Sequence, residues 1–491
     1  MAYGGRRERE VSRMTAARIG FWLGPLLFAA SLLLPAPGGM AGPAWHTAGL
    51  VGWMATWWMT QAVPLSVTAL LPFAAVPFFG GGTAKEVAAD YYSPIIFLLL
   101  GGAFLALAIE RTGLHRRLAA GILDRIGGRG GEFGLLLGFM AAAALLSNII
   151  SNTSTALIMM PMVLAVLAGA ASDPEQGPRT EGLFGALPMG LAFAASIGGL
   201  GTIIGSPTNA IGVGVVQDIS GVEISFAIWA MYGMPVVLLG VPLAAWIVAR
   251  VHRVADHPFD MAAARKAIQP AGAWSSAERR LVPVIALAFL AWMLRSFVAP
   301  FLPEDSFTDG TIAIVMSLLL FVLPDGIGRP LLTWREANHA PWGVLLMFGG
   351  GLALAGAMSR SGLAAWLGEA LLVLDGVPLV IVALALVALV VLITEFASNV
   401  ATASGIMPVV AALAVALGGE SDFRTVLLLA MPAAMAASWG FMLPAGTGPN
   451  AIAWATGRLT LPRLIRAGLA LDLAGIALIV GVAFVVSSVT A

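Results

Sequence analysis

The sequence contains no cysteine and very little charge. None of its 491 residues is Cys, and only 11% are Asp, Glu, Lys or Arg. The absence of Cys excludes disulfides and cysteine-ligated iron–sulfur clusters. A soluble domain is about a quarter charged, so a chain this poor in charge is not built to be surrounded by water. Basic and acidic residues are equal in number, 26 of each, so the excess of positive charge typical of nucleic-acid binding is missing.

Hydrophobic residues take the place of the missing charges. They make up 59% of the chain, and the mean hydropathy is +0.92. Apolar runs of about 20 residues, the length of a membrane-spanning helix, recur along the whole sequence. The sequence therefore predicts an all-α polytopic membrane protein with about 11 transmembrane helices. The predicted spans are 19–36, 46–60, 62–80, 94–112, 184–216, 224–250, 281–299, 308–327, 341–358, 425–457 and 467–489.

A short polar string occurs twice in the same apolar frame. The copies read IISNTSTALIMMP at 149–161 and FASNVATASGIMP at 396–408. Each lies near the centre of an apolar stretch of about 40 residues, 134–170 and 377–416, which is twice the length of a single span. Irregular backbone at this depth is tolerated only inside protein or beside a cavity. We therefore expect two re-entrant hairpins with the Ser-Asn strings at their tips.

The repeat extends beyond these strings. LLLGGAFLALAIERTGL at 98–114 resembles MFGGGLALAGAMSRSGL at 347–363, and IGSPTNAI at 204–211 resembles AGTGPNAI at 445–452. Three paired blocks in the same order indicate an internal duplication. The Gly and Pro residues of the last pair predict broken helices within 184–216 and 425–457.

Charge bias indicates that the two halves are inverted. The first GG block is followed by Arg111, Arg116, Arg117, Arg125 and Arg129, and the second by Arg360 alone. After Asn209 the chain is acidic, whereas after Asn450 it is basic. Arg is strongly preferred over Lys, which is typical of a GC-rich bacterial genome. We expect a bacterial inner (plasma) membrane protein with a cytoplasmic N-terminus and an external C-terminus. We also expect amphipathic helices at 116–126 and around 265–269 along the inner interface.

These observations predict a domain organisation. We expect N-terminal scaffold spans in 1–90 and a first inverted repeat in 91–250, with hairpin 134–170 and broken helix 184–216. A cytoplasmic linker at 251–280 and scaffold spans at 281–340 follow. The second inverted repeat is 341–491, with hairpin 377–416 and broken helix 425–457.

The polar interruptions contain almost no ionisable groups. Glu395 is the exception, and it is a candidate either for a proton carrier or for a hydrogen-bonded structural group. Hydroxyl and carbonyl oxygens suit a hard cation such as sodium, and helix N-termini suit carboxylates. Inverted repeats with broken helices are the architecture of secondary transporters. An enzyme is disfavoured because the apolar segments lack His and paired acids, and a channel has no need of paired ion sites.

At these residues the chain resembles the divalent anion/sodium symporter family. The resemblance rests on the double Ser-Asn-Thr signature, on SIGGLGTIIGSPTNA at 196–210, on FMLPAGTGPNAI at 441–452 and on the GG blocks, so it covers both halves. It implies a homodimer in the lipid bilayer, in which each protomer has a scaffold part and a transport part that moves like an elevator. It also implies symport of sodium ions with a dicarboxylate such as succinate, malate or fumarate.

The resemblance also implies roles for individual residues. One sodium site would use Ser147, Ser151, Asn152 and the carbonyl of Gly205. The symmetric sodium site would use Thr394, Ser398, Asn399 and the carbonyl of Gly446. The substrate would meet Asn152, Thr153, Ser206, Asn399, Val400 and Thr447.

The second motif departs from the family pattern. Val400 stands where the family has Thr, which removes a hydroxyl donor, and Thr402 is a candidate to compensate. The break Thr447-Gly448-Pro449 lacks one proline of the usual form. A proton-coupled or exchange carrier of tricarboxylates or sulfate therefore stays open as an alternative, and a channel or membrane-embedded enzyme is a more distant one.

Overall fold

The chain is helical in the computed structural model, which describes residues 2–125, 130–170, 180–267, 272–374, 376–418 and 422–490. Within these ranges the regular elements are helices, apart from one isolated bridge between Pro324 and Pro330. The all-α prediction is confirmed. Of the predicted amphipathic segments, 116–125 lies in a helix and 265–267 ends another, whereas 126 and 268–269 lie outside the described residues.

Ten helices in the described part of the chain are long and apolar enough to cross a membrane, close to the predicted number. Segment 62–80 differs from prediction, because prolines at 64, 72 and 77 accompany a division into two short helices. The helix predicted at 308–327 ends at Val322, shortly before Pro324. The helices outside the hairpins and breaks are α1 Ala2–Leu33, α2 Gly42–Thr60, α3 Leu65–Thr68, α4 Leu71–Phe79, α5 Ala84–Asp90, α6 Pro94–Thr112, α7 Leu114–Arg125, α12 Phe226–Val251, α13 Met261–Ala267, α14 Ser276–Val298, α15 Asp309–Val322, α16 Trp334–Ala337, α17 Trp342–Arg360, α18 Leu363–Leu371 and α23 Leu461–Thr490.

Both Ser-Asn strings lie at a turn between two helices. The first turn joins α8 (Gly131–Ser147) to α9 (Asn152–Gly169), and the second joins α19 (Leu379–Phe396) to α20 (Asn399–Gly418). The serine caps the following helix in both copies: Ser151 Oγ accepts from Ser154 N at 3.2 Å, and Ser398 Oγ accepts from Ala401 N at 3.2 Å. The Ser-Asn pair therefore ends one helix and starts the next, because a serine at this position satisfies an otherwise free backbone N–H.

Both predicted broken helices are interrupted. The first consists of α10 (Leu183–Gly198), two short 3-10 turns and α11 (Pro207–Ser220), and the second of α21 (Phe423–Ala436) and α22 (Gly448–Ala455). The repeated asparagines bind the carbonyls that the interruptions free. Asn209 Nδ2 donates to Gly199 O at 2.7 Å and Thr202 O at 2.8 Å, and Asn450 Nδ2 donates to Phe441 O at 3.4 Å and Leu443 O at 3.2 Å. Buried carbonyls need such partners.

The hairpins and broken helices of the two repeats pack into one body. Within each repeat the hairpin contacts its own broken helix, α8 against α10 and α19 against α21. Between the repeats, α9 packs against α22 and α20 packs against α11. The tips and interruptions of both halves are thereby brought to the same region.

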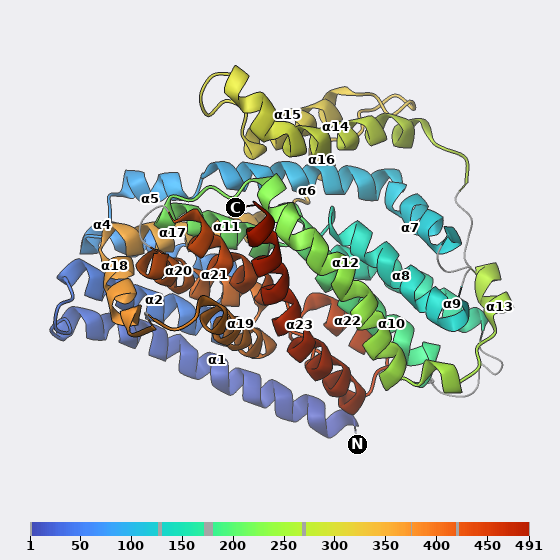
Figure 1. Ribbon diagram of the computed structural model, residues 1–491, viewed down its shortest axis with the longest axis horizontal. Coiled ribbons are helices and arrows are strands. Elements are labelled where there is room, and N and C mark those ends of the chain that lie inside the picture. Colours follow the sequence, from blue (N-terminus) through green and yellow to red (C-terminus); the bar gives the residue numbers. More distant parts are fainter. Residues whose placement is uncertain are drawn as a thin grey trace.

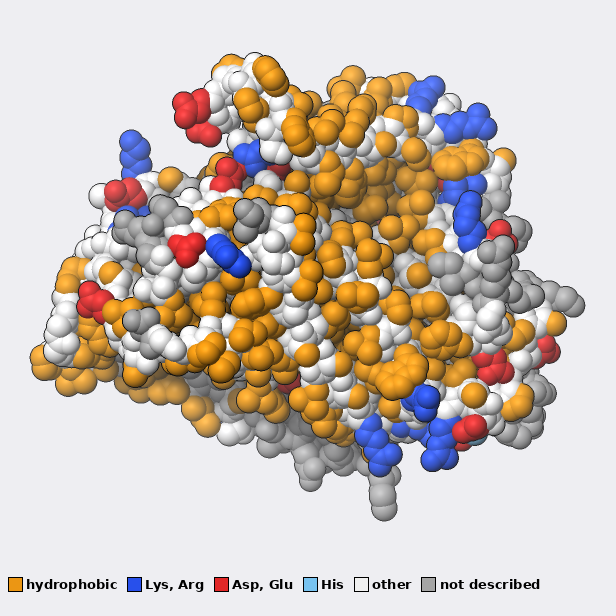
Figure 2. Space-filling view, in the orientation of Figure 1, with side chains coloured by type: hydrophobic (Ala, Val, Ile, Leu, Met, Phe, Trp, Pro, Cys, Tyr) orange, Lys and Arg blue, Asp and Glu red, His pale blue; other side chains and the backbone are white. Residues whose placement is uncertain are grey.

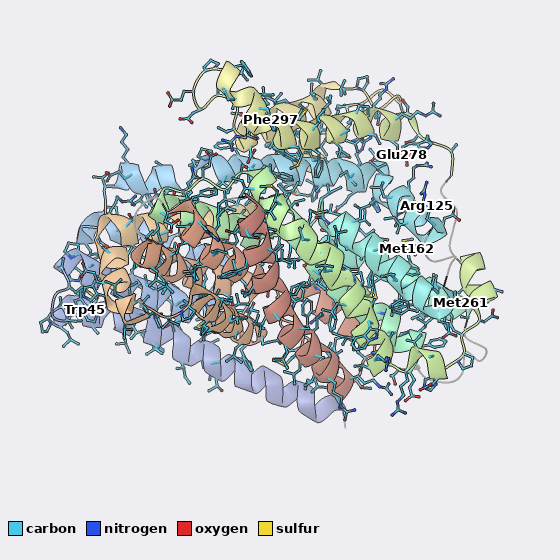
Figure 3. The ribbon with its side chains drawn as sticks, viewed as in Figure 1. Trp45, Arg125, Met162, Met261, Glu278 and Phe297 are labelled. Atoms are coloured by element: carbon cyan, nitrogen blue, oxygen red, sulfur yellow. The ribbon has the colours of Figure 1, made fainter. Side chains whose placement is uncertain are left out.

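Other helices border this body. Figure 1 shows α14, α15 and α16 together along one edge, next to α6, and α6 packs against α15. Figure 3 shows Phe297 and Glu278 towards opposite ends of this edge, and Met162 of α9 close to Met261 of α13. The helix α6 packs both against α15 and against α11, so it lies between the edge layer and the body, and α17 packs against α11 and against α3, α4 and α5.

The duplication extends into this border. Thr83 and Thr333 each form a reciprocal capping box with the glutamate three residues on, Glu86 and Glu336, at an offset of 250 residues (333 − 83). At the ends of the two GG blocks, Arg111 binds Asp325 and Arg360 binds Asp90. The two repeats thus share capping boxes and ion pairs as well as their hydrophobic pattern.

The visible surface fits a membrane environment. Figure 2 shows hydrophobic side chains over most of one face, with most charged side chains towards its margins. Large apolar side chains of α14 such as Leu290 and Phe297 are exposed, as lipid-facing residues are.

Candidate functional site

A cavity of about 1910 Å³ lies where the two repeats meet. It is lined by both hairpin tips, by both helix interruptions and by one face of α6. The six residues predicted to contact substrate all contribute to this lining: Asn152, Thr153, Ser206, Asn399, Val400 and Thr447.

Four helices begin at this cavity. Asn152 starts α9, Pro207 starts α11, Asn399 starts α20 and Gly448 starts α22, and all four residues line the cavity. Each helix N-terminus carries unpaired N–H groups and roughly half a positive charge. Four of them together amount to roughly two positive charges, without any Lys or Arg in the described lining. The backbone alone makes this cavity suitable for an anion with two negative charges.

Oxygen atoms converge beside the first tip. Ser147 is fully buried, and its Oγ lies 2.7 Å from Asn152 Oδ1 and 2.6 Å from the carbonyl oxygen of Ala195. The same end of the Asn152 amide lies 3.1 Å from Gly205 O and 3.2 Å from Ala195 O. Three oxygens from the hairpin and the broken helix thus lie within 3.2 Å of Asn152 Oδ1.

The second tip repeats this arrangement. Thr394 is fully buried, and its Oγ1 lies 3.0 Å from Asn399 Oδ1 and 2.7 Å from Ala437 O. Ala195 and Ala437 are 242 residues apart (437 − 195), close to the offset of the Ser-Asn strings, 247 (399 − 152). The two clusters are therefore copies of one local structure.

With the amide oxygens of Asn152 and Asn399 facing the clusters, both clusters contain more hydrogen-bond acceptors than protons to satisfy them. A hydroxyl has one proton, yet Ser147 and Thr394 each lie within hydrogen-bonding distance of two acceptor oxygens. Turning the Asn152 amide would place its nitrogen among the acceptors, since amide orientation is assigned from hydrogen bonding. With Oδ1 facing the carbonyls, the atoms that could bind a cation are all neutral oxygens, and such ligands suit a hard monovalent cation.

Two predicted cation ligands, the hydroxyls of Ser151 and Ser398, lie outside the oxygen clusters. The hydroxyls of Ser151 and Ser398 cap α9 and α20 rather than entering the oxygen clusters. The carbonyl oxygen of Gly205 lies 3.1 Å from the Asn152 amide. The N–H of Gly205 donates to Thr202 O at 3.3 Å and that of Gly446 to Leu443 O at 3.2 Å, and the carbonyl of Gly446 stays a predicted ligand. In the second cluster the carbonyl of Ala437 takes part, which side-chain patterns do not reveal because any residue supplies a carbonyl.

The two tips differ at the third position of the motif. Thr153 lies against α22: a Cβ at Gly448 would be 2.4 Å from Thr153 Oγ1, so only glycine permits this approach. Val400 lines the cavity at the other tip without a hydroxyl. Thr402 is buried, outside the cavity lining, and its Oγ1 has no hydrogen-bond partner. The hydroxyl of Thr402 therefore does not replace the one missing at position 400.

Glu395 has a defined structural role in this conformation. Its side chain is 2% exposed, and it accepts hydrogen bonds from Met442 N at 2.9 Å and Leu443 N at 3.1 Å. The carboxylate thus binds the backbone of the second interruption. Of the two roles considered for it, these contacts favour the structural one.

The contributions of Asn209 and Asn450 were not predicted from the sequence, although a signal was present. Both belong to the repeated Asn-Ala-Ile string, and each is fully buried with its amide on two carbonyls of its own interruption. Their side chains shape the breaks and do not appear in the cavity lining.

Known proteins are similar to this chain over nearly its whole length. Residues 22–488 match the family described as the sodium:sulfate symporter transmembrane region. The sodium-dependent dicarboxylate transporter SdcS of Staphylococcus saprophyticus is 38% identical, over 99% of this chain and 94% of that protein. SdcS of Staphylococcus aureus strain USA300 is also 38% identical, over 95% and 91%.

Solved structures are similar in fold, and one of them serves as an example. It is the Alcanivorax borkumensis YdaH transporter, with a TM-score of 0.56 and 17% identity, covering 82% of this chain and 86% of that one. At this identity the likeness concerns the fold alone.

Proposed function

The chain belongs to the sodium:sulfate symporter family, and we propose that it is a secondary transporter that couples sodium entry to the uptake of C4-dicarboxylates. Succinate, malate and fumarate are the expected substrates. The resemblance to divalent anion/sodium symporters is confirmed by the family match over residues 22–488. The observation that best supports the proposal is the convergence of four helix N-termini on a cavity flanked by two matching oxygen clusters.

Each oxygen cluster would bind one sodium ion. In the first, the ligands would be Ser147 Oγ, Asn152 Oδ1 and the carbonyls of Ala195 and Gly205. In the second, they would be Thr394 Oγ1, Asn399 Oδ1 and the carbonyl of Ala437. A bound cation supplies the positive charge that the excess acceptors require.

The dicarboxylate would lie between the two ions. Its carboxylates would accept hydrogen bonds from the N-terminal backbone of the four helices and from Asn152, Thr153, Asn399, Thr447 and Ser206, with Val400 as an apolar neighbour. Because the Asn side chains and helix N-termini belong to the same tips as the ion ligands, loss of an ion would also displace substrate ligands. This shared structure is a physical basis for coupling.

The proposal includes a membrane arrangement. The basic residues after α6 would lie in the cytoplasm, with the N-terminus, and the C-terminus would lie outside. The hairpins and broken helices would move together as the transport part against a scaffold that includes α6 and α17, and two protomers would associate through their scaffolds. The membrane would be the bacterial inner membrane.

Uptake by the purified full chain in proteoliposomes tests the proposal. Succinate should accumulate when sodium is higher outside, and accumulation should disappear when choline replaces sodium. Succinate uptake that is indifferent to sodium would contradict the coupling. Sodium-dependent uptake of sulfate with no uptake of succinate would contradict the substrate class, and this comparison is needed because the family description names sulfate.

A further inference from the structure

The cavity face of α6 carries a single charged side chain. Residues 99, 102, 103, 106, 107 and 110 of this helix line the cavity. Their spacing of three and four residues is one face of a helix. The first five are Leu, Gly or Ala, and the sixth is Glu110. An apolar stripe therefore ends at one carboxylate.

Glu110 faces the first hairpin tip. The Ser154 hydroxyl interacts with its carboxylate, and Ser154 directly follows the substrate-contacting residues of that tip. The neighbouring Arg111 does not neutralise Glu110, because its guanidinium is held by Asp325, Glu336 and the carbonyl of Pro330. When ionised, the carboxylate of Glu110 contributes negative charge to a cavity whose described lining contains no Lys or Arg.

The second repeat lacks this charge. The residue equivalent to Glu110 is Ser359 (offset 249), which is exposed and lies outside the cavity lining. The second GG helix instead contributes Val344 and Leu345. The duplicated site is thus symmetric in its helix N-termini but carries one acid, on one side.

The four helices that begin at the cavity pack in two pairs, α9 against α22 and α20 against α11, and Thr153 and Gly448 bring the first two N-termini together. One pair is available for each carboxylate of a dicarboxylate. A third carboxylate would find no further helix N-terminus and would have to face the α6 stripe and Glu110.

We propose that Glu110 is a specificity-determining residue that limits the substrate to two carboxylates, by repelling a third one placed against α6. This inference rests on the proposed dicarboxylate transport. Glu110 is not needed to bind a dicarboxylate, because the helix N-termini and the Asn and Thr side chains already serve both of its ends. The side chain of Glu110 acts instead on the part of the substrate other than the two bound carboxylates, and it repels that part if it carries a negative charge.

A matched pair of competitors tests this. Carboxysuccinate carries a third carboxylate at the position where methylsuccinate carries a methyl group. The two compounds are therefore similar in size and differ in charge. Inhibition of sodium-driven succinate uptake by each would be measured at a mildly alkaline pH, where the carboxyls of both competitors are ionised. In the unchanged protein methylsuccinate should inhibit more strongly than carboxysuccinate. In Glu110→Gln the preference should shrink by about tenfold, the effect expected for one unit charge several ångströms away in a partly solvated site.

Two control variants separate charge from shape. Glu110→Asp keeps the charge and should keep the preference, and His339→Gln removes the other ionisable side chain of the described lining and should also keep it. Thermal stabilisation of the purified variants by each competitor with sodium provides a second readout that does not require transport.

The outcomes are distinct. If the unchanged protein does not take up succinate with sodium, the proposed function fails. If it does, but Glu110→Gln leaves the ratio of the two inhibition constants unchanged, the charge limit is overturned. A variant that weakens both competitors equally would show that Glu110 positions Ser154 and does not select charge, which would overturn the proposal too.

Discussion

In the first half-site Ser147 Oγ lies 2.7 Å from Asn152 Oδ1 and 2.6 Å from Ala195 O, and in the second Thr394 Oγ1 lies 3.0 Å from Asn399 Oδ1 and 2.7 Å from Ala437 O. The oxygen clusters agree closely, although the side chains around them do not. Thr153 has become Val400, and Glu110 on α6 has no acidic counterpart on α17. The duplicated part is the part that would hold a simple spherical ion, and the divergent part faces an anion that has a shape and a charge distribution.

The largest expected effect concerns the two asparagines at the tips. Asn152→Ala and Asn399→Ala should each reduce sodium-driven succinate uptake by about two orders of magnitude or more, because each removes a ligand shared by ion and substrate. Uptake in proteoliposomes is the measurement. Asn338→Ala, at an exposed helix end outside the cavity lining, is the matched control and should transport normally. Normal transport by either Asn152→Ala or Asn399→Ala would contradict the claim that the two half-sites are equivalent.

A smaller and more specific effect is expected from the two buried hydroxyls. Ser147→Ala and Thr394→Val should each raise the sodium concentration needed for half-maximal uptake, by about tenfold, since one ligand is lost from each cluster. Thr394→Ser keeps the hydroxyl and should behave like the unchanged protein. If only one of the two variants changed the sodium dependence, the symmetry of the clusters would not extend to their function.

The motif difference should affect substrate affinity by a few-fold. Val400→Thr adds a hydroxyl donor beside the cavity and should lower the succinate KM about fivefold, which corresponds to one hydrogen bond of about 1 kcal/mol. Thr153→Val makes the opposite exchange and should raise the succinate KM. Both would be measured at saturating sodium, so that ion binding does not contribute. An unchanged KM in both variants would place the substrate away from the third position of the motif.

The smallest effect concerns an exposed contact between the halves. Arg463, near the start of α23, donates to Glu181, ahead of α10, and this hydrogen bond holds the pKa of the Glu181 carboxyl below its usual value. A lowered pKa in the folded state means that the contact stabilises above the unfolded pKa and that the stabilisation is lost as pH falls through the folded pKa. The Tm of the unchanged protein should therefore fall slightly more than the Tm of Glu181→Gln when the pH is lowered into the acid range. An identical pH profile would show that this exposed pair does not contribute to stability, as is common for surface pairs.

Much of this architecture could be predicted because it depends on the types of side chain in the sequence and on their repetition. The hydrophobic runs predict the helices, and the Ser-Asn strings predict where the hairpins turn, since serine caps the following helix. The Gly and Pro residues of the repeated blocks at 204–211 and 445–452 predict the interruptions. The equivalence of Ser147 and Thr394 also follows from their equal distance to the motif.

Other features depend on backbone geometry that no residue type reveals. The carbonyls of Ala195 and Ala437 complete the clusters, and alanine gives no sign of that role. The carbonyl of Gly205 lies 3.1 Å from the Asn152 amide, and a glycine in the sequence gives no sign of where its carbonyl points. The segment 62–80 has the hydrophobicity of one span, but it forms two short helices that start at Leu65, directly after Pro64, and at Leu71, directly before Pro72. The pairing of α9 with α22 and of α20 with α11 arises from tertiary packing between distant repeats.

Equilibrium binding of sodium to the purified protein, in the presence of saturating succinate, tests the central claim most directly. We expect Ser147→Ala and Thr394→Val each to weaken the binding of one ion by about tenfold and to leave the other ion unchanged, and the double variant to weaken both. A single variant that binds both ions as tightly as the unchanged protein, or a double variant that weakens no more than one ion, would contradict the account of two separate and equivalent cation sites.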